Sequence, residues 1–496
     1  MLLKLLENGE PDASAIVVPG GPRLTYQALR DEVLRGAEAL AGLGLRRDQA
    51  VGTVFENGAE AIVLFLAAAL VAASAPLNPA YTEAELRFYL EDLDARALIV
   101  PPGGAEAARR ALPQGAILVE AAIAGDGRLQ LESSGRPPRR ADPGEPGGDD
   151  VALMLHTSGT TGRPKRVPLR HRNLAASVDN TATHYQLGPE DISLCVMPLF
   201  HVHGLMASAL ATLRTGGTVV VPAPFNPLSF WTVAAEQRPT WYSAVPTIHR
   251  MVLARARGER PPASRSLRFV RSCSSALAPE LMAEIEQHLG VPVLEAYGMT
   301  EACHQIASNP LPPAGRLPGS VGLGTGVEMA VVDGAGAPLP AGTPSQVVIR
   351  GPNVIDGYAA NPEANAESFL HGWFRTGDQG VLDASGYLTL IGRIKELINR
   401  GGEKISPREI DEVLLRHPSV AEAVAFGVAH PALGEQVAAA VVLREPVAER
   451  ELLSHCRRQL AAFKVPAKLY VVEAIPRTAT GKVQRRKVAE ALEAGR

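Results

Sequence analysis

Thr157-Ser-Gly-Thr-Thr-Gly-Arg-Pro-Lys165 is the stretch that decides the fold of this chain. It follows directly on an apolar run at residues 151–156 (VALMLH), which predicts a buried strand, so the stretch itself is expected to be a loop. Glycines let a backbone approach an anion closely and expose its N–H groups. The loop combines two glycines, four hydroxyl side chains and one lysine: Gly159, Gly162, Thr157, Ser158, Thr160, Thr161 and Lys165. These groups predict a cradle for a triphosphate, although the spacing is not that of a P-loop.

The residues before this loop alternate between strand and helix patterns. Short apolar runs at residues 15–18 (AIVV), 51–55 (VGTVF) and 97–101 (ALIVP) predict strands. Thr82 and Glu85 have the spacing of a capping box, which predicts that a helix begins there. Alternating strands and helices are typical of a parallel sheet covered by helices.

Changes in composition mark the expected domain boundaries. Residues 133–150 (SSGRPPRRADPGEPGGDD) are rich in proline, glycine and charge, which predicts a solvated linker. Further βα patterns begin at residue 151, and residues 321–350 show short strands with Gly/Pro turns. Near residue 406, Ser-Pro-Arg-Glu combines a serine cap, a first-turn proline and a glutamate, which predicts a helix start. The sequence therefore predicts an α/β fold. A large N-terminal domain (residues 1–392) holds parallel βα sheets and a small β-rich subdomain, and a small α+β C-terminal domain (residues 393–496) follows.

Composition excludes several classes of protein. The 496 residues carry a net charge of −3, with 46% hydrophobic and 20% charged residues, so a disordered chain is excluded and a general nucleic-acid binder is not expected. The four cysteines lack any Cys-x-x-Cys spacing, which favours a reducing compartment and argues against structural zinc. The most apolar run, residues 61–76, is shorter than a membrane span and predicts a buried helix. No targeting signal is recognisable at either end, so we expect a cytoplasmic protein without a membrane span.

Five further motifs give the sequence a family resemblance. They are YGMTE at 297–301, WFRTGD at 373–378, GRIKELI at 392–398, GGEK at 401–404 and PRTATGK at 476–482. Together with the glycine-rich loop they resemble the adenylate-forming superfamily of acyl-CoA synthetases, luciferases and adenylation domains. The resemblance covers nearly the whole chain.

The resemblance implies a reaction in two halves that uses ATP, Mg²⁺ and coenzyme A. A carboxylate attacks the α-phosphate of ATP and gives an acyl-adenylate and pyrophosphate; a thiol then attacks the acyl carbon and releases AMP. In this scheme the loop residues 157–162 and Lys165 bind the nucleotide, and the hydroxyls of Thr157, Ser158, Thr160 and Thr161 hold the β- and γ-phosphates. Tyr297 belongs to the nucleotide site, Thr300 contacts the α-phosphate and Glu301 binds Mg²⁺. Asp378 accepts the ribose hydroxyls, since a carboxylate only accepts, and Arg393 supports ribose and phosphate.

The same resemblance implies a mobile C-terminal domain. Lys482 matches the catalytic lysine of adenylation, where a cation stabilises developing charge; without its Thr-Gly context it would be a solvated charge. Lys395 lies at the hinge about which the domain turns between the two half-reactions. Gly401 and Gly402 line the thiol channel, or simply form a tight turn, and both roles can hold together.

Polar residues occupy the positions where the family places its acid pocket. His201 fits the catalytic gate beside the acyl group, and His203 is either a pocket residue or a hydrogen-bonded core histidine. Ser274 and Ser275 stand where small residues are usual, and His304 stands where apolar residues are common. No aspartate is present to bind an amine, so an amino acid is not expected. A short, polar or anionic acid fits these residues better than a fatty chain does.

A subgroup resemblance narrows the substrate. The stretches EAYGMTEACHQIASNPLP and RSCSSALAP are similar to plant and fungal oxalate–CoA ligases. Oxalate has a second carboxylate that needs donors when buried, and His304, Ser274, Ser275, His203 and Arg271 are the candidates. Malonate, acetate and glyoxylate-like acids stay open, and a carrier protein is the alternative to free coenzyme A as thiol. A luciferase would need a roomy aromatic pocket, and this chain has 5% aromatic residues. A nucleotide sensor should have lost Lys482 or Glu301, and both are present. Whether the chain is a monomer or a homodimer also stays open.

Overall fold

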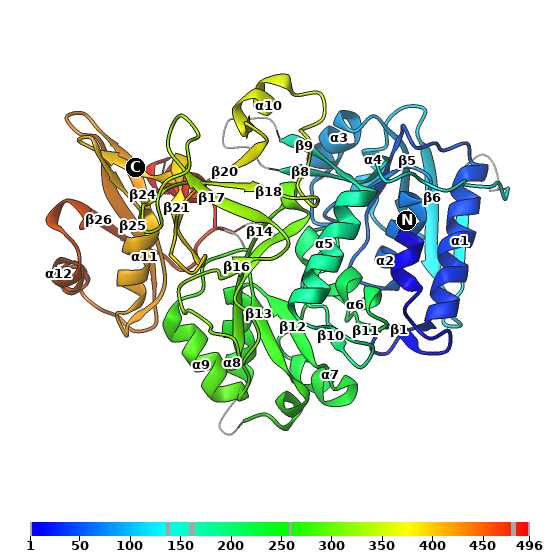
Figure 1. Cartoon of the computed structure of the whole chain (residues 1–496), viewed down its shortest axis with the longest axis horizontal. Coiled ribbons are helices and arrows are strands. Elements are labelled where there is room, and N and C mark those ends of the chain that lie inside the picture. Colours follow the sequence, from blue (N-terminus) through cyan, green and yellow to red (C-terminus); the bar gives the residue numbers. More distant parts are fainter. Residues whose placement is uncertain (1, 135–138, 158–163, 257–259, 478–482, 495–496) are drawn as a thin grey trace. The chain divides into compact units, whose positions relative to one another are not determined.

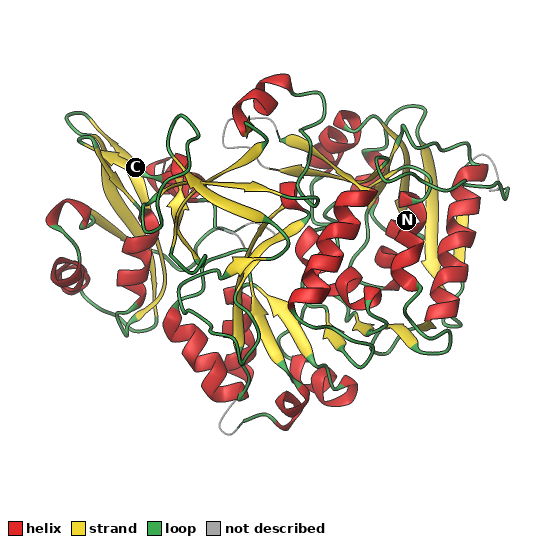
Figure 2. Ribbon diagram, viewed as in Figure 1, coloured by secondary structure: helices red, strands yellow, loops and turns green. Residues whose placement is uncertain are grey.

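The computed structural model describes residues 2–134, 139–157, 164–256, 260–477 and 483–494 (Figures 1 and 2). The chain forms two compact units. The first comprises Met1–Glu328 and Arg350–Phe369, and the second comprises Met329–Ile349 and Leu370–Arg496. The predicted α/β class is confirmed. The predicted boundary at residues 392/393 does not coincide with an edge of either unit and stays a prediction.

One sheet of the first unit carries the glycine-rich loop. Its seven strands have the order β7-β6-β5-β3-β4-β8-β9. The interior pairs are parallel, as predicted, whereas β7 and β9 pair antiparallel at the two edges. The strand bounds are β3 Ala50–Thr53, β4 Ala73–Pro76, β5 Ala95–Val100, β6 Ile117–Ile123, β7 Leu129–Ser133, β8 Val151–Thr157 and β9 Lys165–Arg170.

The helices beside these strands begin where local sequence places them. They are α1 Tyr26–Gly42, α2 Ala59–Ala69, α3 Glu83–Asp92 and α4 Glu106–Arg110, and α1 packs side by side with α2 (Figure 1). The capping box is confirmed: the Glu85 amide donates to Thr82 Oγ1, and the Thr82 amide donates to Glu85 Oε2 at 2.8 Å. The apolar run 61–76 is only partly the predicted helix, because α2 ends at Ala69 and the run finishes in strand β4.

The second sheet of this unit has nine strands in the order β16-β15-β14-β13-β12-β10-β11-β1-β2. Their bounds are β1 Ser14–Val17, β2 Arg23–Thr25, β10 Ile192–Leu194, β11 Thr218–Val220, β12 Trp241–Ala244, β13 Phe269–Ser272, β14 Val293–Met299, β15 His304–Ser308 and β16 Leu323–Gly324. The AIVV strand was expected with the N-terminal strands, and this grouping is wrong. It pairs in parallel with β11, Ile16 opposite Val219, and so belongs to this sheet.

Helices and a buried core support the nine-stranded sheet. The helices of this region are α5 His171–His184, α6 Ala211–Arg214, α7 Phe230–Gln237, α8 Pro246–Arg255, α9 Pro279–Leu289 and α10 Pro362–Ser368. A π-helix, His203–Leu210, and short 3₁₀ helices at Leu2–Leu6, Pro262–Ser266 and Thr300–Ala302 complete it. Leu194, Val220, Tyr242, Val270 and Ile285 form part of one apolar core. Strands of this sheet are therefore rigid supports for the side chains at their ends.

The second unit contains two five-stranded sheets. One comprises β17 Glu328–Val332, β18 Ser345–Arg350, β19 Phe369–Leu370, β20 Trp373–Leu382 and β21 Leu388–Arg393. The other comprises β22 Ile398–Arg400, β23 Glu403–Ile405, β24 Val420–His430, β25 Gly434–Leu443 and β26 Lys468–Val471. The helices are α11 Pro407–Leu415, α12 Glu449–Gln459 and α13 Arg485–Ala494, with short 3₁₀ helices at Ile394–Glu396 and Ala462–Lys464.

Helix α11 begins where the sequence predicts, but its serine acts differently. Ser406 is the N-cap, yet its hydroxyl makes no capping bond and donates instead to the carbonyl of Ile391 at 2.7 Å. The hydroxyl that the local pattern predicts to cap the helix therefore makes a tertiary hydrogen bond instead. None of the described helices combines the length and the hydropathy needed to cross a bilayer.

Candidate active site

The two ends of the glycine-rich loop lie opposite each other on the hairpin of β8 and β9. Thr157 is the last residue of β8, Lys165 is the first of β9, and the two residues pair across the hairpin. Of the predicted loop residues, Ser158, Gly159, Thr160, Thr161 and Gly162 lie outside the described residues. The described ends of the loop are therefore the paired ends of two antiparallel, hydrogen-bonded strands.

A single carboxylate holds both stems of this hairpin. His156 and Arg166 face each other across the strands, one residue outside Thr157 and Lys165. His156 Nε2 lies 3.0 Å from Asp92 Oδ2, Arg166 Nε lies 3.6 Å from the same oxygen, and Arg166 Nη1 donates to the Asp92 carbonyl at 2.9 Å. Asp92 is the last residue of α3 and its side chain is only 10% exposed. Sequence reasoning missed this contact, because 64 residues separate Asp92 from His156.

The predicted nucleotide residues Tyr297, Thr300 and Glu301 come from one tight reversal of the chain. Strand β14 ends at Met299, the 3₁₀ helix Thr300–Ala302 turns the chain, and β15 returns antiparallel. Gly298 must be glycine here, since a Cβ would lie 1.8 Å from the carbonyl oxygen of His304. Tyr297 is buried in the strand and Thr300 is half-buried at the turn.

Glu301, predicted to bind Mg²⁺, is a buried carboxylate. It is 6% exposed, and its Oε1 accepts a hydrogen bond from the Tyr358 hydroxyl at 2.9 Å. Among the residues that the structure describes, no basic side chain forms an ion pair with Glu301. No group of three His, Cys, Asp or Glu in the described residues could hold a metal by itself. One carboxylate suits Mg²⁺, which usually completes its shell with waters and substrate phosphates.

The residues predicted for the acid pocket converge on Arg271 in strand β13. Arg271 is completely buried, and its guanidinium lies beside the Cys273 thiol and makes five further polar contacts. Nε donates to the Tyr185 hydroxyl at 2.7 Å, Nη1 to Ser243 Oγ at 2.9 Å, and Nη2 to Gln305 Oε1 at 2.9 Å. Two histidine nitrogens complete the set: Nε2 of His304 at 2.9 Å and Nε2 of His203 at 3.3 Å. None of these five partners is a carboxylate.

The two histidines of this cluster are neutral. Burial lowers the pKa of His203 and of His304 well below the usual value, and the charge of Arg271 lowers both further. A guanidinium only donates hydrogen bonds, so both Nε2 atoms are acceptors and both rings carry their proton on Nδ1. His203 Nδ1 then donates to Ser274 Oγ at 3.0 Å, and the two rings stack with centroids 4.8 Å apart.

Backbone strain collects at the same residues. Ser274, Cys303 and His304 have φ angles of 69°, 50° and 101°, a region that side chains other than glycine rarely enter. Such strain costs free energy and persists mainly where function requires it. Ser275 is half-buried beside Ser274. His201 is half-buried too, and its Nδ1 accepts from the His203 amide at 3.1 Å. The gate role of His201 stays a prediction.

Asp378 and Arg393 form an ion pair within the second unit. They lie opposite each other on β20 and β21, with Arg393 Nε 2.8 Å from Asp378 Oδ1. The Asp378 side chain is 8% exposed, and the Asp378 amide donates to Thr376 Oγ1 at 3.1 Å. The ion pair is compatible with the prediction that Asp378 contacts the ribose and that Arg393 contacts ribose and phosphate.

The predicted hinge and thiol residues also lie in the second unit. Lys395 is exposed on the 3₁₀ helix Ile394–Glu396. Gly401 and Gly402 form a two-residue hairpin turn between β22 and β23 with φ angles of 61° and 94°, so the tight-turn role is confirmed. Their thiol role and the hinge role of Lys395 stay predictions. Lys482 lies outside the described residues.

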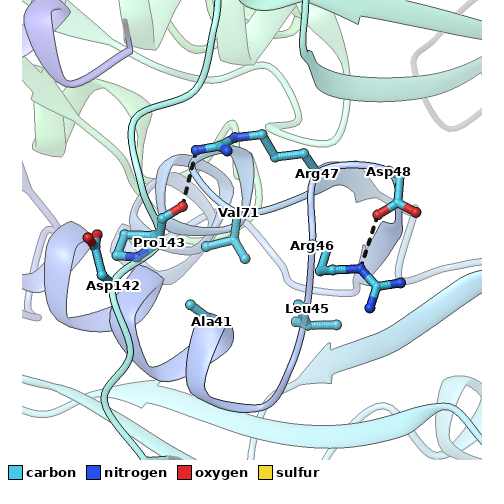
Figure 3. Close-up of a pocket in the computed structure, with 8 residues that line it drawn as sticks. All are labelled: Ala41, Leu45, Arg46, Arg47, Asp48, Val71, Asp142 and Pro143. Atoms are coloured by element: carbon cyan, nitrogen blue, oxygen red, sulfur yellow. Dashed lines mark hydrogen bonds and ion pairs between the residues drawn. The ribbon is translucent and has the colours of Figure 1, made fainter.

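A separate cavity of about 470 Å³ lies elsewhere in the first unit. Its lining residues are Ala41, Leu45, Arg46, Arg47, Asp48, Val71, Asp142 and Pro143 (Figure 3). Arg46 pairs with Asp48 at 3.5 Å, and Arg47 pairs with Asp150 at 3.3 Å. Both charges are therefore satisfied, and no residue predicted for the active site lines this cavity.

Comparison with known proteins places the chain in a family. Residues 7–359 match the model of the AMP-binding enzyme family, and residues 409–482 match that of the AMP-binding enzyme C-terminal domain. The chain is 49% identical to the probable CoA ligase CCL9 of Humulus lupulus, over 99% of this chain and 95% of that protein. It is 45% identical to an oxalate–CoA ligase of Arabidopsis thaliana, over 98% of this chain and 97% of that protein.

A solved structure has the same fold over the whole length. ATP-bound MatB from Rhodopseudomonas palustris is 32% identical, with a TM-score of 0.90, and the match covers 99% of this chain and 98% of that chain. An ATP-bound structure thus matches this chain over nearly its whole length. The matched length includes the glycine-rich hairpin, the YGMTE turn and the pair of Asp378 and Arg393. The chain belongs to the family of AMP-binding, adenylate-forming CoA ligases.

Proposed function

We propose that this ATP-dependent acid–CoA ligase acts on oxalate and forms oxalyl-CoA. The observation that carries the proposal is the buried charge of Arg271, which has no carboxylate among its partners in the described residues. Arginine keeps its charge at every physiological pH, and a buried charge without an opposite charge costs several kcal/mol. An anion bound beside it removes that cost.

Oxalate supplies such an anion because it has two carboxylates. One must be free to attack ATP, and the other stays charged and needs a cation and donors. Arg271 supplies the cation. His304 accepts from Arg271 through Nε2, so its Nδ1–H is a donor for a substrate oxygen. Acetate has the right size for a short pocket but leaves the Arg271 charge without a partner.

The rest of the cluster orients these two groups. Tyr185, Ser243 and Gln305 fix the guanidinium from three sides, and the stacked ring of His203 supports His304. Side chains held in this way lose little freedom when the ligand binds, which favours a small, rigid substrate. Ser274 is half-buried and contacts His203 Nδ1, and Ser275 is half-buried next to it in the chain.

Two chemical steps follow for the proposed substrate. A carboxylate oxygen of oxalate attacks the α-phosphorus of ATP, and the bond to the bridging oxygen of pyrophosphate breaks. The thiolate of CoA then attacks the activated acyl carbon, and the bond to the AMP oxygen breaks. Thr157 and Lys165 would contact the phosphates, Thr300 the α-phosphate, and Asp378 with Arg393 the ribose. Mg²⁺ held by Glu301 would neutralise phosphate charge. Lys482 would approach the bridging oxygen.

Relatives support the choice of acid and of thiol. The Arabidopsis protein at 45% identity is named for oxalate, and the hop protein at 49% is named as a CoA ligase without an acid. Malonate also has two carboxylates and is the main competing substrate. A carrier-bound thiol competes with free CoA as the acceptor.

Substrate competition tests the proposal. We expect kcat/KM for oxalate to exceed the value for acetate by about 10⁴-fold, since a site built to hydrogen-bond a group rejects an analogue lacking it. His304→Ala should raise the KM for oxalate and narrow the preference over acetate, while the KM for ATP changes little. The assay measures AMP release with oxalate, malonate, acetate and octanoate, in the presence of free CoA or of a phosphopantetheinylated carrier.

Three outcomes would contradict parts of the proposal. A preference for octanoate would exclude a short anionic pocket. A preference for malonate would replace the substrate but keep the Arg271 anion site. Turnover only with the carrier would exclude free CoA as the acceptor.

A further inference from the structure

Tyr358 lies between Lys165 and Glu301, two residues predicted for the nucleotide site. The sequence alone did not predict a role for it. It is 7% exposed, in the segment between β18 and α10. Its amide donates to Asn365 Oδ1 at 2.7 Å, and Asn365 Nδ2 donates back to its carbonyl at 3.0 Å. The next amide, that of Ala359, donates to the carbonyl of Arg166 on β9 at 3.0 Å. The backbone of Tyr358 is thus fixed directly beside the strand that begins with Lys165.

The side chain of Tyr358 contacts a cation and an anion at once. Its hydroxyl donates to Glu301 Oε1 at 2.9 Å, and the ammonium of Lys165 lies 4.5 Å from the centroid of its ring. The second distance is within the range of a cation–π contact. Lys165 and Glu301 are both described, and they form no ion pair with each other. The neutral tyrosine therefore satisfies each charge separately.

We propose that Tyr358 is a positioning residue that keeps Lys165 and Glu301 from neutralising each other. The proposal rests on the proposed roles of Lys165 toward phosphate and of Glu301 toward Mg²⁺. Two opposite charges in a site of low dielectric attract strongly, and a direct Lys165–Glu301 pair would use the groups that the ligand needs. The hydroxyl occupies one oxygen of Glu301 and leaves the other for the cation. The ring holds the ammonium without an opposing charge.

Two substitutions separate the two contacts. Tyr358→Phe keeps the ring and removes the hydroxyl. The affinity of the site for Mg²⁺ should therefore fall about tenfold, which is the effect of one hydrogen bond to a charged group. Affinity for a nucleotide without metal should stay nearly constant. Tyr358→Leu removes the ring as well, so nucleotide affinity should fall by about threefold or more in addition.

The measurement is calorimetric binding of a non-hydrolysable ATP analogue to the full chain across a series of Mg²⁺ concentrations. Combining Tyr358→Leu with Glu301→Gln gives the decisive comparison. Without the carboxylate, Lys165 cannot form the ion pair with residue 301 that the ring is proposed to prevent. Loss of the ring should therefore cost clearly less in the Glu301→Gln background than in the natural chain. A merely structural tyrosine would cost the same in both.

Tyr26→Phe is a matched control. It removes another buried hydroxyl, which contacts the carbonyls of Leu213 at 3.1 Å and Gly217 at 2.7 Å. We expect it to lower the Tm and to leave the Mg²⁺ dependence unchanged.

The results distinguish this inference from the function on which it rests. If both Tyr358 variants lower the Tm but keep the natural Mg²⁺ dependence, while Glu301→Gln changes it, Tyr358 is only structural and the metal role of Glu301 stands. If Glu301→Gln itself leaves the Mg²⁺ dependence unchanged, the metal role is wrong and the inference about Tyr358 is overturned with it. Should Tyr358→Leu fail to fold, Tyr358→Phe still decides the hydroxyl contact.

Discussion

Nη2 of Arg271 lies 2.9 Å from Nε2 of His304, and this contact joins a permanent charge to a neutral imidazole in the interior of the first unit. The two residues are 33 positions apart and come from β13 and β15, which lie on either side of β14 in the same sheet. Because Arg271 can only donate, the contact fixes the tautomer of His304. It also leaves the positive charge without a negative partner among the described residues.

Arg271→Met should therefore remove the preference for a second carboxylate. The five N–H groups of Arg271 all donate to protein groups, so Arg271 acts on the substrate through its charge. We expect kcat/KM for oxalate to fall by about 10- to 100-fold, because the attraction between two opposite charges that is lost is ~1.5–3 kcal/mol in a partly buried site. Turnover of acetate should change far less. The measurement is the ratio of the two kcat/KM values.

Arg268→Met is the matched control for this substitution. Arg268 lies three residues earlier, and its Nη1 pairs with both oxygens of the buried Asp191 at 2.7 and 2.6 Å. Its loss should lower the Tm, because Asp191 keeps a buried charge, and should not change the choice of acid. Equal loss of oxalate and acetate turnover in Arg271→Met would show that Arg271 only supports the fold.

The free energy of unfolding should fall as the pH drops below about 6.5. His171 is buried, its Nε2 lies 2.9 Å from the carbonyl of Ala69, and burial lowers its pKa to about 4. Between pH 6.5 and 4 the unfolded state binds a proton at His171 that the folded state does not. The contribution of His171 to stability is therefore full above pH 6.5 and declines by up to ~1.4 kcal/mol per pH unit below it. Chemical denaturation at pH 7.5, 6 and 5 measures this slope.

His171→Gln keeps a donor for the Ala69 carbonyl and removes the titration. Its stability should vary less with pH than that of the natural chain. An identical slope for the two proteins would assign the acid sensitivity to other groups, of which His249, with a pKa of about 4, is the next to replace.

Asp92→Ala should weaken nucleotide binding without touching the acid pocket. The carboxylate holds His156 and Arg166, the two residues flanking the described ends of the glycine-rich loop, so its loss frees both stems of the hairpin. We expect the KM for ATP to rise about tenfold, the effect of losing about 1.4 kcal/mol of orientation, and the KM for oxalate to stay constant. Steady-state kinetics with each substrate varied in turn measure both.

Asp179→Ala serves as the control, since it breaks the exposed Arg214–Asp179 pair at 2.7 Å and should have little effect. A rise in both KM values for Asp92→Ala would indicate general disorder and not a defined role at the loop.

Lys482→Ala should slow formation of the adenylate far more than transfer of a supplied acyl-adenylate to CoA. The reason is that a cation at the bridging oxygen stabilises charge that develops only in the first half-reaction, a contact of ~3–4 kcal/mol. Single-turnover measurements of pyrophosphate release and of thioester formation separate the two steps. An equal loss in both would mean that the lysine has a structural role.

Local signals predicted those parts of the chain whose partners lie within a few residues. The capping box of Thr82 and Glu85 and the glycine turn at residues 401 and 402 follow from short-range sterics and hydrogen bonds, and the structure confirms both. The same reasoning failed for Ser406, because a carbonyl of Ile391 competes for its hydroxyl. It also grouped β1 with the wrong strands, since strand order depends on pairing across the whole unit.

The sequence by itself predicted the chemistry of this protein. The residue types of the glycine-rich loop predict a phosphate cradle. The motifs that contain Glu301, Asp378 and Arg393 predict metal and ribose contacts through their resemblance to the adenylate-forming family. Only the tertiary structure decided how these groups are held. Asp92 reaches His156 over 64 residues, Tyr358 reaches Glu301 over 57, and Arg271 collects its partners from four strands and helices. Such contacts leave no periodic or local pattern, because they depend on which strands become neighbours when the sheets form.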